Sequence, residues 1–250
     1  MNEAAVAVVV FLALLLAAVG AIHISNRMPH HYRSDDTAKV IAGVASIFVM
    51  LTSIAFGLMI NSAKNTYAAI DSNVHAFATD LIILDRMLRV YGIAGTDARS
   101  QLVAYMNEAI EHPARADPTD DKPDSAGAAL DAFGNTLATI QPPDRFHESL
   151  LLDIRQQYRG LVERRWTIIE QSEGTIPSPL IWMLIGWMVL VFGSFGYRAP
   201  MNAMVITSFV TAAFLIAMAF YLVLDMDVPF HGPIQISDAP LRRALAEMKL

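Results

Sequence analysis

Four long runs of this chain contain no Asp, Glu, Lys or Arg. They are 23, 24, 24 and 26 residues long: Ala4–Asn26, Val40–Ala63, Gly174–Tyr197 and Ala199–Leu224. About 20 apolar residues in a helix, rising about 1.5 Å each, span the roughly 30 Å hydrocarbon core of a bilayer. Each run can therefore cross a membrane once, and the sequence predicts an integral membrane protein.

The first run could instead be a signal peptide. An ordinary signal peptide has an apolar segment of about 7–15 residues behind a positively charged start. Here the apolar run is longer, and Glu3 precedes it with no Lys or Arg. We therefore expect a retained first transmembrane helix.

The four runs form two pairs in the sequence, separated by a mostly polar stretch. The expected boundaries are 1–63 for transmembrane helices 1 and 2 (about 4–24 and 40–61), 64–176 for a helical domain outside the membrane, 177–224 for transmembrane helices 3 and 4, and 225–250 for a C-terminal tail packed on the helical domain. With four crossings, both termini and the middle domain share one side of the membrane.

The distribution of basic residues bears on which side that is. Lys and Arg near membrane ends collect on the cytoplasmic side. The loop side carries Arg27, Arg33, Lys39 and Arg198, and the middle-domain side carries slightly more, namely Lys64, Arg159, Arg164, Arg165, Arg242 and Arg243. We expect a multi-pass protein of the cell (inner) membrane with its middle domain and both termini in the cytoplasm.

The middle domain has the pattern of packed helices. Eight apolar or aromatic residues follow alternating spacings of 3 and 4: Tyr67, Ile70, Val74, Phe77, Leu81, Leu84, Leu88 and Tyr91. A period of 3.5 sets one apolar seam on a helix. Because Asn61–Asn65 contains no Gly or Pro, we expect this helix to continue from the second span, with Asp85 and Arg89 paired at i,i+4 and Gly92 at its end.

Three further helices are expected in the same domain. They run from Asp97 to Glu111 with Thr96 as cap, from a cap at Ser125, and over about Phe146–Gln171. No strand pattern stands out, so the predicted class is an all-α membrane protein with a helical domain between its second and third transmembrane helices.

Composition excludes several functions. The net charge is −6 and the chain has no cysteine, so it lacks a basic footprint for nucleic acid and cannot form disulfides or thiolate metal sites. It also lacks a serine–histidine–acid arrangement, a Gly-rich phosphate loop and a metalloprotease motif. We expect neither an enzyme nor a bound cofactor.

The second run carries the candidate pore residues. Phe48, Thr52, Phe56 and Ile60 recur every fourth residue and share one stripe of the helix. In a symmetric oligomer the stripe could line a pore without intramembrane charge, since hydrophobic constrictions gate by dewetting. The same spacing also fits packing against neighbouring helices or lipid. A proton-coupled carrier is disfavoured, because no ionisable residue sits centrally in a span.

The segment after the last span is the most distinctive part of the sequence. Its notable residues are Asp225, Asp227, Pro229, Phe230, Gly232, Asp238, Pro240 and Leu241. Pro229 and Gly232 predict a turn, and Asp238 is a candidate cap for a final helix with Pro240 in its first turn. The two aspartates Asp225 and Asp227 could hold a cation or mark the membrane interface.

This tail resembles that of bestrophin-type membrane proteins. Bacterial bestrophins look similar after their last span: an acidic residue, Pro-Phe-Gly, a short gap, and Asp-x-Pro-Leu leading into a terminal helix. The matching residues here are Asp227, Pro229, Phe230, Gly232, Asp238, Pro240 and Leu241, with His231 inserted before the glycine. The whole chain is still more similar to a bacterial bestrophin-like family, in a second span ending near Asn-Ser-Ala and a Leu-Asp-Arg helix such as Leu84–Arg86.

The resemblance implies a pentamer with an ion pore on its axis, lined by the second span and most often conducting anions, with Thr52, Phe56 and Ile60 at the neck. Two features depart from bestrophins. Asn65–Asp71 lacks the tryptophans of their Arg-Trp-Trp stretch, and the acidic cluster that clasps calcium in animal members is reduced to Asp225 and Asp227.

An alternative is a membrane sensor or an interaction or scaffold protein without transport activity, because bundles form ligand pockets between their helices. The expected partners are the lipid bilayer, further copies of the chain and small ions, but not nucleic acid.

Overall fold

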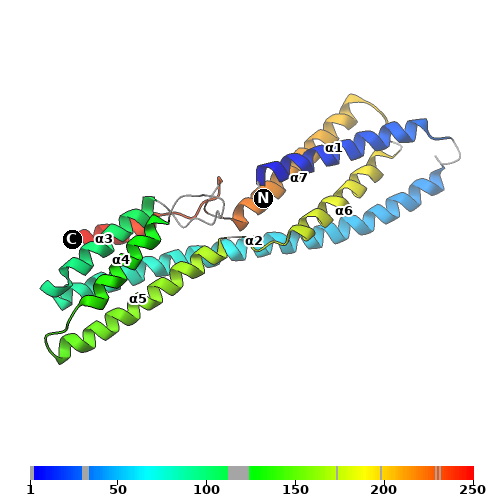
Figure 1. The fold of residues 1–250 in the computed structure, drawn as a ribbon. Coiled ribbons are helices and arrows are strands. Elements are labelled where there is room, and N and C mark those ends of the chain that lie inside the picture. The colour runs from blue at the N-terminus through cyan, green and yellow to red at the C-terminus, as the bar shows by residue number, and fades with distance from the viewer. Residues whose placement is uncertain are drawn as a thin grey trace. The chain divides into compact units, whose positions relative to one another are not determined.

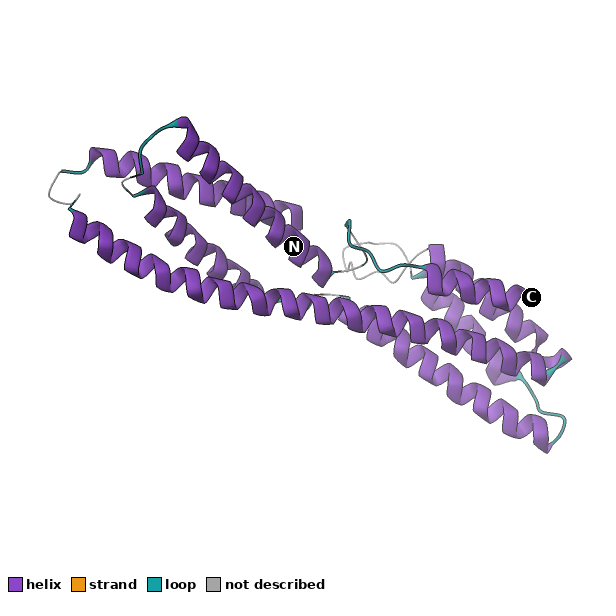
Figure 2. Cartoon of the chain, turned by 180° about the vertical axis from the view of Figure 1, so that it is seen from behind, coloured by secondary structure: helices purple, strands orange, loops and turns teal. Residues whose placement is uncertain are grey.

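The computed structural model describes residues 3–29, 34–111, 124–172, 174–197, 199–228, 230 and 232–250. All regular structure in these residues is helical, which confirms the predicted all-α class (Figures 1 and 2). The helices are α1 (Glu3–Arg27), α2 (Asp35–Tyr91), α3 (Thr96–Glu111), α4 (Ser125–Thr139), α5 (Arg145–Gln171), α6 (Ser178–Gly196), α7 (Ala203–Asp227) and α8 (Ala239–Lys249), with a 3-10 turn at Ile93–Gly95.

Four of these helices are long and apolar enough to cross a membrane, as the charge-free runs predict. They are α1, α2, α6 and α7, whose most apolar 18-residue windows have mean hydropathies of 3.0, 2.2, 1.8 and 2.2. The α2 helix continues well beyond its apolar part and is 57 residues long. The expected continuation of the second span into the middle domain is therefore confirmed.

The chain forms two compact units. The span unit contains Met1–Asn65 and Thr175–Asp227, and the helical unit contains Thr66–Gly174 and Val228–Leu250. The α2 helix contributes its first part to the span unit and its second part to the helical unit.

In the span unit, α1 packs against both α6 and α7 (Figure 1). The α1 helix, from the first pair of apolar runs, therefore packs against both helices of the second pair. Buried residues recur at every fourth position of α1, namely Val6, Val10, Leu14, Ala18 and Ile22. The α6 helix approaches closely at Gly196, where an added Cβ would overlap the carbonyl oxygen of Ala18. Small residues at such crossings let helix backbones meet.

In the helical unit, the predicted seam of α2 is the core. Its seven residues from Ile70 to Tyr91 are at most 6% exposed, and they form one cluster with apolar side chains of α3, α4, α5 and α8. At the start of the seam, Tyr67 is half-buried and its hydroxyl donates to the carbonyl of Gln235 at 3.2 Å.

Asp85 is a buried charged group of this unit. Its carboxylate is 2% exposed and accepts from Nε of Arg89 at 2.8 Å, which confirms the predicted pair. It also accepts from Nε of Arg99, on α3, at 2.7 Å. Both guanidinium groups donate in addition to the carbonyl of Met248 on α8. One buried carboxylate thereby organises contacts among α2, α3 and α8.

The helix ends differ slightly from the expected caps. Gly92 follows α2 with φ 81°, a conformation that favours glycine, but Thr96 lies inside α3 because a 3-10 turn precedes it. Asp124 caps α4 in place of Ser125, accepting from the backbone N of Gly127 at 2.8 Å.

Asp144 caps α5 by accepting from the backbone N of His147 at 2.9 Å. The hydrogen bonds from His147 hold the pKa of the Asp144 carboxyl below its usual range.

Candidate functional site

Three of the four predicted pore residues lie against α6 or α7 of the same chain. Thr52 is 2% exposed and lines a cavity of about 310 Å³ together with side chains of α6 and α7. The ring of Phe56 lies 5.0 Å from that of Phe220, measured between centroids, and Phe48 lies 6.2 Å from Trp187. Ile60, the fourth residue, is 42% exposed.

The opposite side of α2 is exposed and has its own regular pattern. We call it the outer seam. It comprises Ile47, Met50, Ile54, Gly57, Asn61 and Lys64, at spacings of 3, 4, 3, 4 and 3. Its apolar side chains are 53–66% exposed. Since each residue turns a helix by about 100°, this seam is centred opposite Thr52. The predicted stripe of every fourth residue follows only one side of the helix and so does not include the outer seam.

The outer seam is not uniformly apolar. It contains Gly57 and Asn61, neither of which contributes apolar surface to lipid. It also ends on Lys64, which is the first charged residue after Val40–Ala63. An assembly of several copies could bring these residues together around an axis.

Asp227 is held by hydrogen bonds to the chain that leads into α6. It is 4% exposed, and its Oδ2 accepts from the backbone N of Thr175 at 2.9 Å and of Ile176 at 3.0 Å. Its Oδ1 accepts from Oγ1 of Thr175 at 2.9 Å. The carboxylate therefore ties the end of α7 to the chain leading into α6.

Asp225, the other candidate cation ligand, is 2% exposed. Within the described residues, no group of three or more His, Cys, Asp or Glu side chains is placed to hold a metal ion. Because both oxygens of Asp227 already accept hydrogen bonds from the protein, its geometry favours a structural role.

The rest of the tail motif belongs to the helical unit. Gly232 has φ 88°, as the predicted turn requires, whereas Pro229 lies outside the described residues. Asp238 occupies the N-cap position of α8, but its carboxylate accepts from Nε of Arg242 at 2.7 Å in place of a backbone N–H.

Pro240, in the first turn of α8, is buried. Phe230 and Leu241 line a cavity of the helical unit.

We expect Asp227→Asn and Thr175→Val each to destabilise the protein by about 1–3 kcal/mol, because each removes a hydrogen bond of the buried Asp227 carboxylate. The double variant should cost less than the sum of the two, since both remove the same contact. Thermal unfolding of the three variants in one detergent measures this coupling. Strictly additive losses would mean that the two side chains do not act together.

Comparison with known proteins gives one family. The Bestrophin-like domain matches residues 11–241 of the chain. No curated protein sequence is significantly similar.

Crystal structures of a bacterial Bestrophin homolog from Klebsiella pneumoniae are similar in fold. One single-residue variant is 15% identical, with a TM-score of 0.67 over 98% of this chain and 99% of that one. Another is 15% identical, with a TM-score of 0.68 over 97% of each chain. A third structure, phased with zinc, is 16% identical, with a TM-score of 0.63 over 96% of each.

Proposed function

We propose that this chain, which belongs to the Bestrophin-like family, assembles with copies of itself into an ion channel of the cell membrane. The observation that carries the proposal is the family match over residues 11–241, joined to a bestrophin fold over nearly the whole chain. Bestrophins are known as ion channels. The chain also has the four apolar helices that such a protein needs.

The exposure of α2 supports self-assembly. Only 11% of its most apolar window is buried, against 28% for α1 and 33% for α6. A helix so little covered by its own chain is available to neighbouring copies and to a central axis. We propose a pentamer, as the family resemblance implies, with α2 lining the pore and the middle domain in the cytoplasm.

Within α2 we place the outer seam at the pore. Ile47, Met50 and Ile54 would form an apolar constriction of the kind that gates by dewetting. Lys64 would add a ring of ammonium groups at the end of the seam, which favours anions. In this arrangement Phe48, Thr52 and Phe56 hold α2 against α6 and α7, and Ile60 lies beside the pore.

The test is ion flux from proteoliposomes that contain the purified full-length protein, comparing chloride with potassium. We expect Gly57→Phe to reduce chloride flux to the level of empty liposomes, because the ring would fill the pore. An added Cβ at Gly57 meets no atom within 4 Å, so a single chain has room for the change.

Gly20→Phe, on α1, is the matched control, because a Cβ there also meets nothing within 4 Å. It should leave the flux unchanged. Phe56→Ala separates the two faces of α2: a changed chloride-to-potassium ratio in this variant, with normal flux in Gly57→Phe, would place the pore on the predicted stripe. No flux from folded, assembled wild-type protein would favour a sensor or interaction protein without transport.

A further inference from the structure

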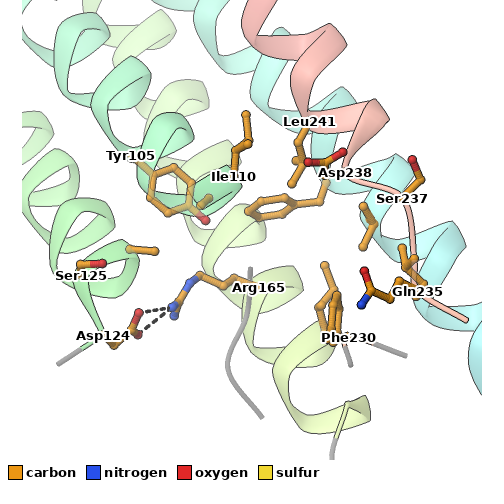
Figure 3. A pocket seen from close by; sticks show the side chains of 16 residues that line it. Tyr105, Ile110, Asp124, Ser125, Arg165, Phe230, Gln235, Ser237, Asp238 and Leu241 are labelled. Carbon is orange, nitrogen blue, oxygen red and sulfur yellow. Dashed lines mark hydrogen bonds and ion pairs between the residues drawn. The ribbon is translucent and has the colours of Figure 1, made fainter. Parts of the chain in front are cut away.

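A cavity of about 480 Å³ lies inside the helical unit, bordered by α2, α3, α4, α5 and the segment that leads into α8 (Figure 3). Its volume falls within the range of about 300–1,000 Å³ that is typical of small-molecule sites. Its wall is mostly apolar, with Phe77, Ile110, Ile168 and Phe230 among the side chains that line it. Such a wall accommodates a hydrocarbon body rather than a hydrated ion.

One side of the cavity holds a buried cation. The side chain of Arg165 is 10% exposed, whereas that of its partner Asp124 is 57% exposed. Nη2 of Arg165 donates to both carboxylate oxygens of Asp124, at 2.8 and 2.6 Å (Figure 3). A side-chain hydrogen bond also joins the guanidinium to the hydroxyl of Tyr105. Because a guanidinium carries five N–H groups, Arg165 can still donate to a further acceptor.

The charge of Arg165 is only partly balanced. Asp124 also accepts from the backbone N of Gly127 as the cap of α4, where the helix terminus carries a partial positive charge of about half a unit. The Asp124 carboxylate thus interacts with two positive groups, Arg165 and the N-terminus of α4. Solvent screens the charge of the exposed carboxylate more than that of the buried guanidinium. The potential on the cavity side of Arg165 is therefore positive.

Neutral donors lie beside the guanidinium. Tyr105 is 1% exposed, and burial raises the pKa of its hydroxyl, which stays protonated and able to donate. Figure 3 shows Tyr105, Ser125 and Arg165 on the same side of the cavity. On the other side, the charge of Asp238 is balanced by Arg242, with 2.7 Å between Oδ2 and Nη2.

We propose that this cavity binds a small monocarboxylic acid with a ring-sized apolar body. Its carboxylate lies against the guanidinium of Arg165 and the hydroxyl of Tyr105, and its body lies among Phe77, Phe230 and their apolar neighbours. Asp124 neutralises the single guanidinium charge only in part. The site therefore suits a ligand with one negative charge rather than a nucleotide, which carries several. The site does not depend on whether the protein conducts ions.

Isothermal titration calorimetry of the full-length protein in lipid nanodiscs tests this, with empty nanodiscs as the blank. The probes are 2-naphthoate and its uncharged isostere 2-naphthamide. We expect 2-naphthoate to bind at least about tenfold more tightly, because charge-assisted hydrogen bonds exceed neutral ones by about that factor in affinity.

Three variants locate the bound probe. Arg165→Lys should weaken 2-naphthoate binding about tenfold, since a lysine lacks the planar fork of N–H groups. Arg164→Lys is the matched control: the neighbouring residue pairs with Asp80 at 2.7 Å and does not line the cavity, so the affinity should not change. Ala109→Leu should weaken 2-naphthoate binding by occupying part of the cavity while leaving the Arg165–Asp124 pair in place.

Circular dichroism melting of each variant shows that it is folded. Equal affinity for the two probes, or unchanged 2-naphthoate binding in folded Arg165→Lys, would overturn the proposed role of the guanidinium. No heat above the blank with wild-type protein would overturn the site itself.

Discussion

Asp85→Ala should lower the free energy of unfolding by about 2–3 kcal/mol. Removing one partner from a buried ion pair costs about 3–5 kcal/mol, and the exposure of Arg89 and Arg99, at 38% and 33%, reduces that cost. The two guanidinium groups would then face each other across α2 and α3 without their shared anion. The melting temperature should fall by about 4–12 °C.

Helical circular dichroism, recorded in detergent at a fixed heating rate, measures this change. Asp71→Ala on the same helix is the control, because its side chain is 41% exposed and lies 4.0 Å from Nε2 of His75. Surface pairs of this kind contribute about 0–1 kcal/mol. Equal melting temperatures for the two variants would show that Asp85 does not hold α2, α3 and α8 together.

Gly196→Ala should destabilise the span unit by about 1–3 kcal/mol or more. The new Cβ would overlap the carbonyl oxygen of Ala18, which is a backbone atom and cannot rotate away. The α6 helix must therefore move away from α1, and the buried side chains along α1 lose contacts that nothing else replaces.

The control for this change lies one turn earlier on the same helix. An added Cβ at Gly193 meets no atom within 4 Å, so Gly193→Ala should leave stability nearly unchanged. Size-exclusion chromatography after heating in detergent measures how much of each variant stays folded. Equal survival of Gly196→Ala and Gly193→Ala after heating would show that the helix backbones do not meet closely at Gly196.

The features that the sequence predicts correctly are local ones. The four spans follow from uninterrupted apolar runs, and the core seam of α2 follows from the 3.5-residue spacing up to Tyr91. The Asp85–Arg89 pair was predictable because i,i+4 residues are neighbours on any helix. The role of Arg99 was not, because it depends on how a separate helix is placed.

In the candidate sites, too, local features were predictable from the sequence and features that depend on helix packing were not. Spacing correctly groups Thr52 with Phe56 on one side of α2, but it cannot say that α6 and α7 cover that side. The Arg165–Asp124 pair joins residues 41 positions apart, so only packing brings it together. Asp124 and Ser125 are adjacent residues that both favour capping, and geometry decides between them.

The contact of Asp227 with Thr175 and Ile176 has a consequence for how the last two spans reach the membrane. The chain joins α6 to α7 at one end, and the carboxylate fastens their other ends together. The two helices are therefore joined at both ends, and α1 packs against each of them. We expect α6 and α7 to enter the bilayer as one piece during biosynthesis, with the aspartate and the threonine arriving together at the same surface.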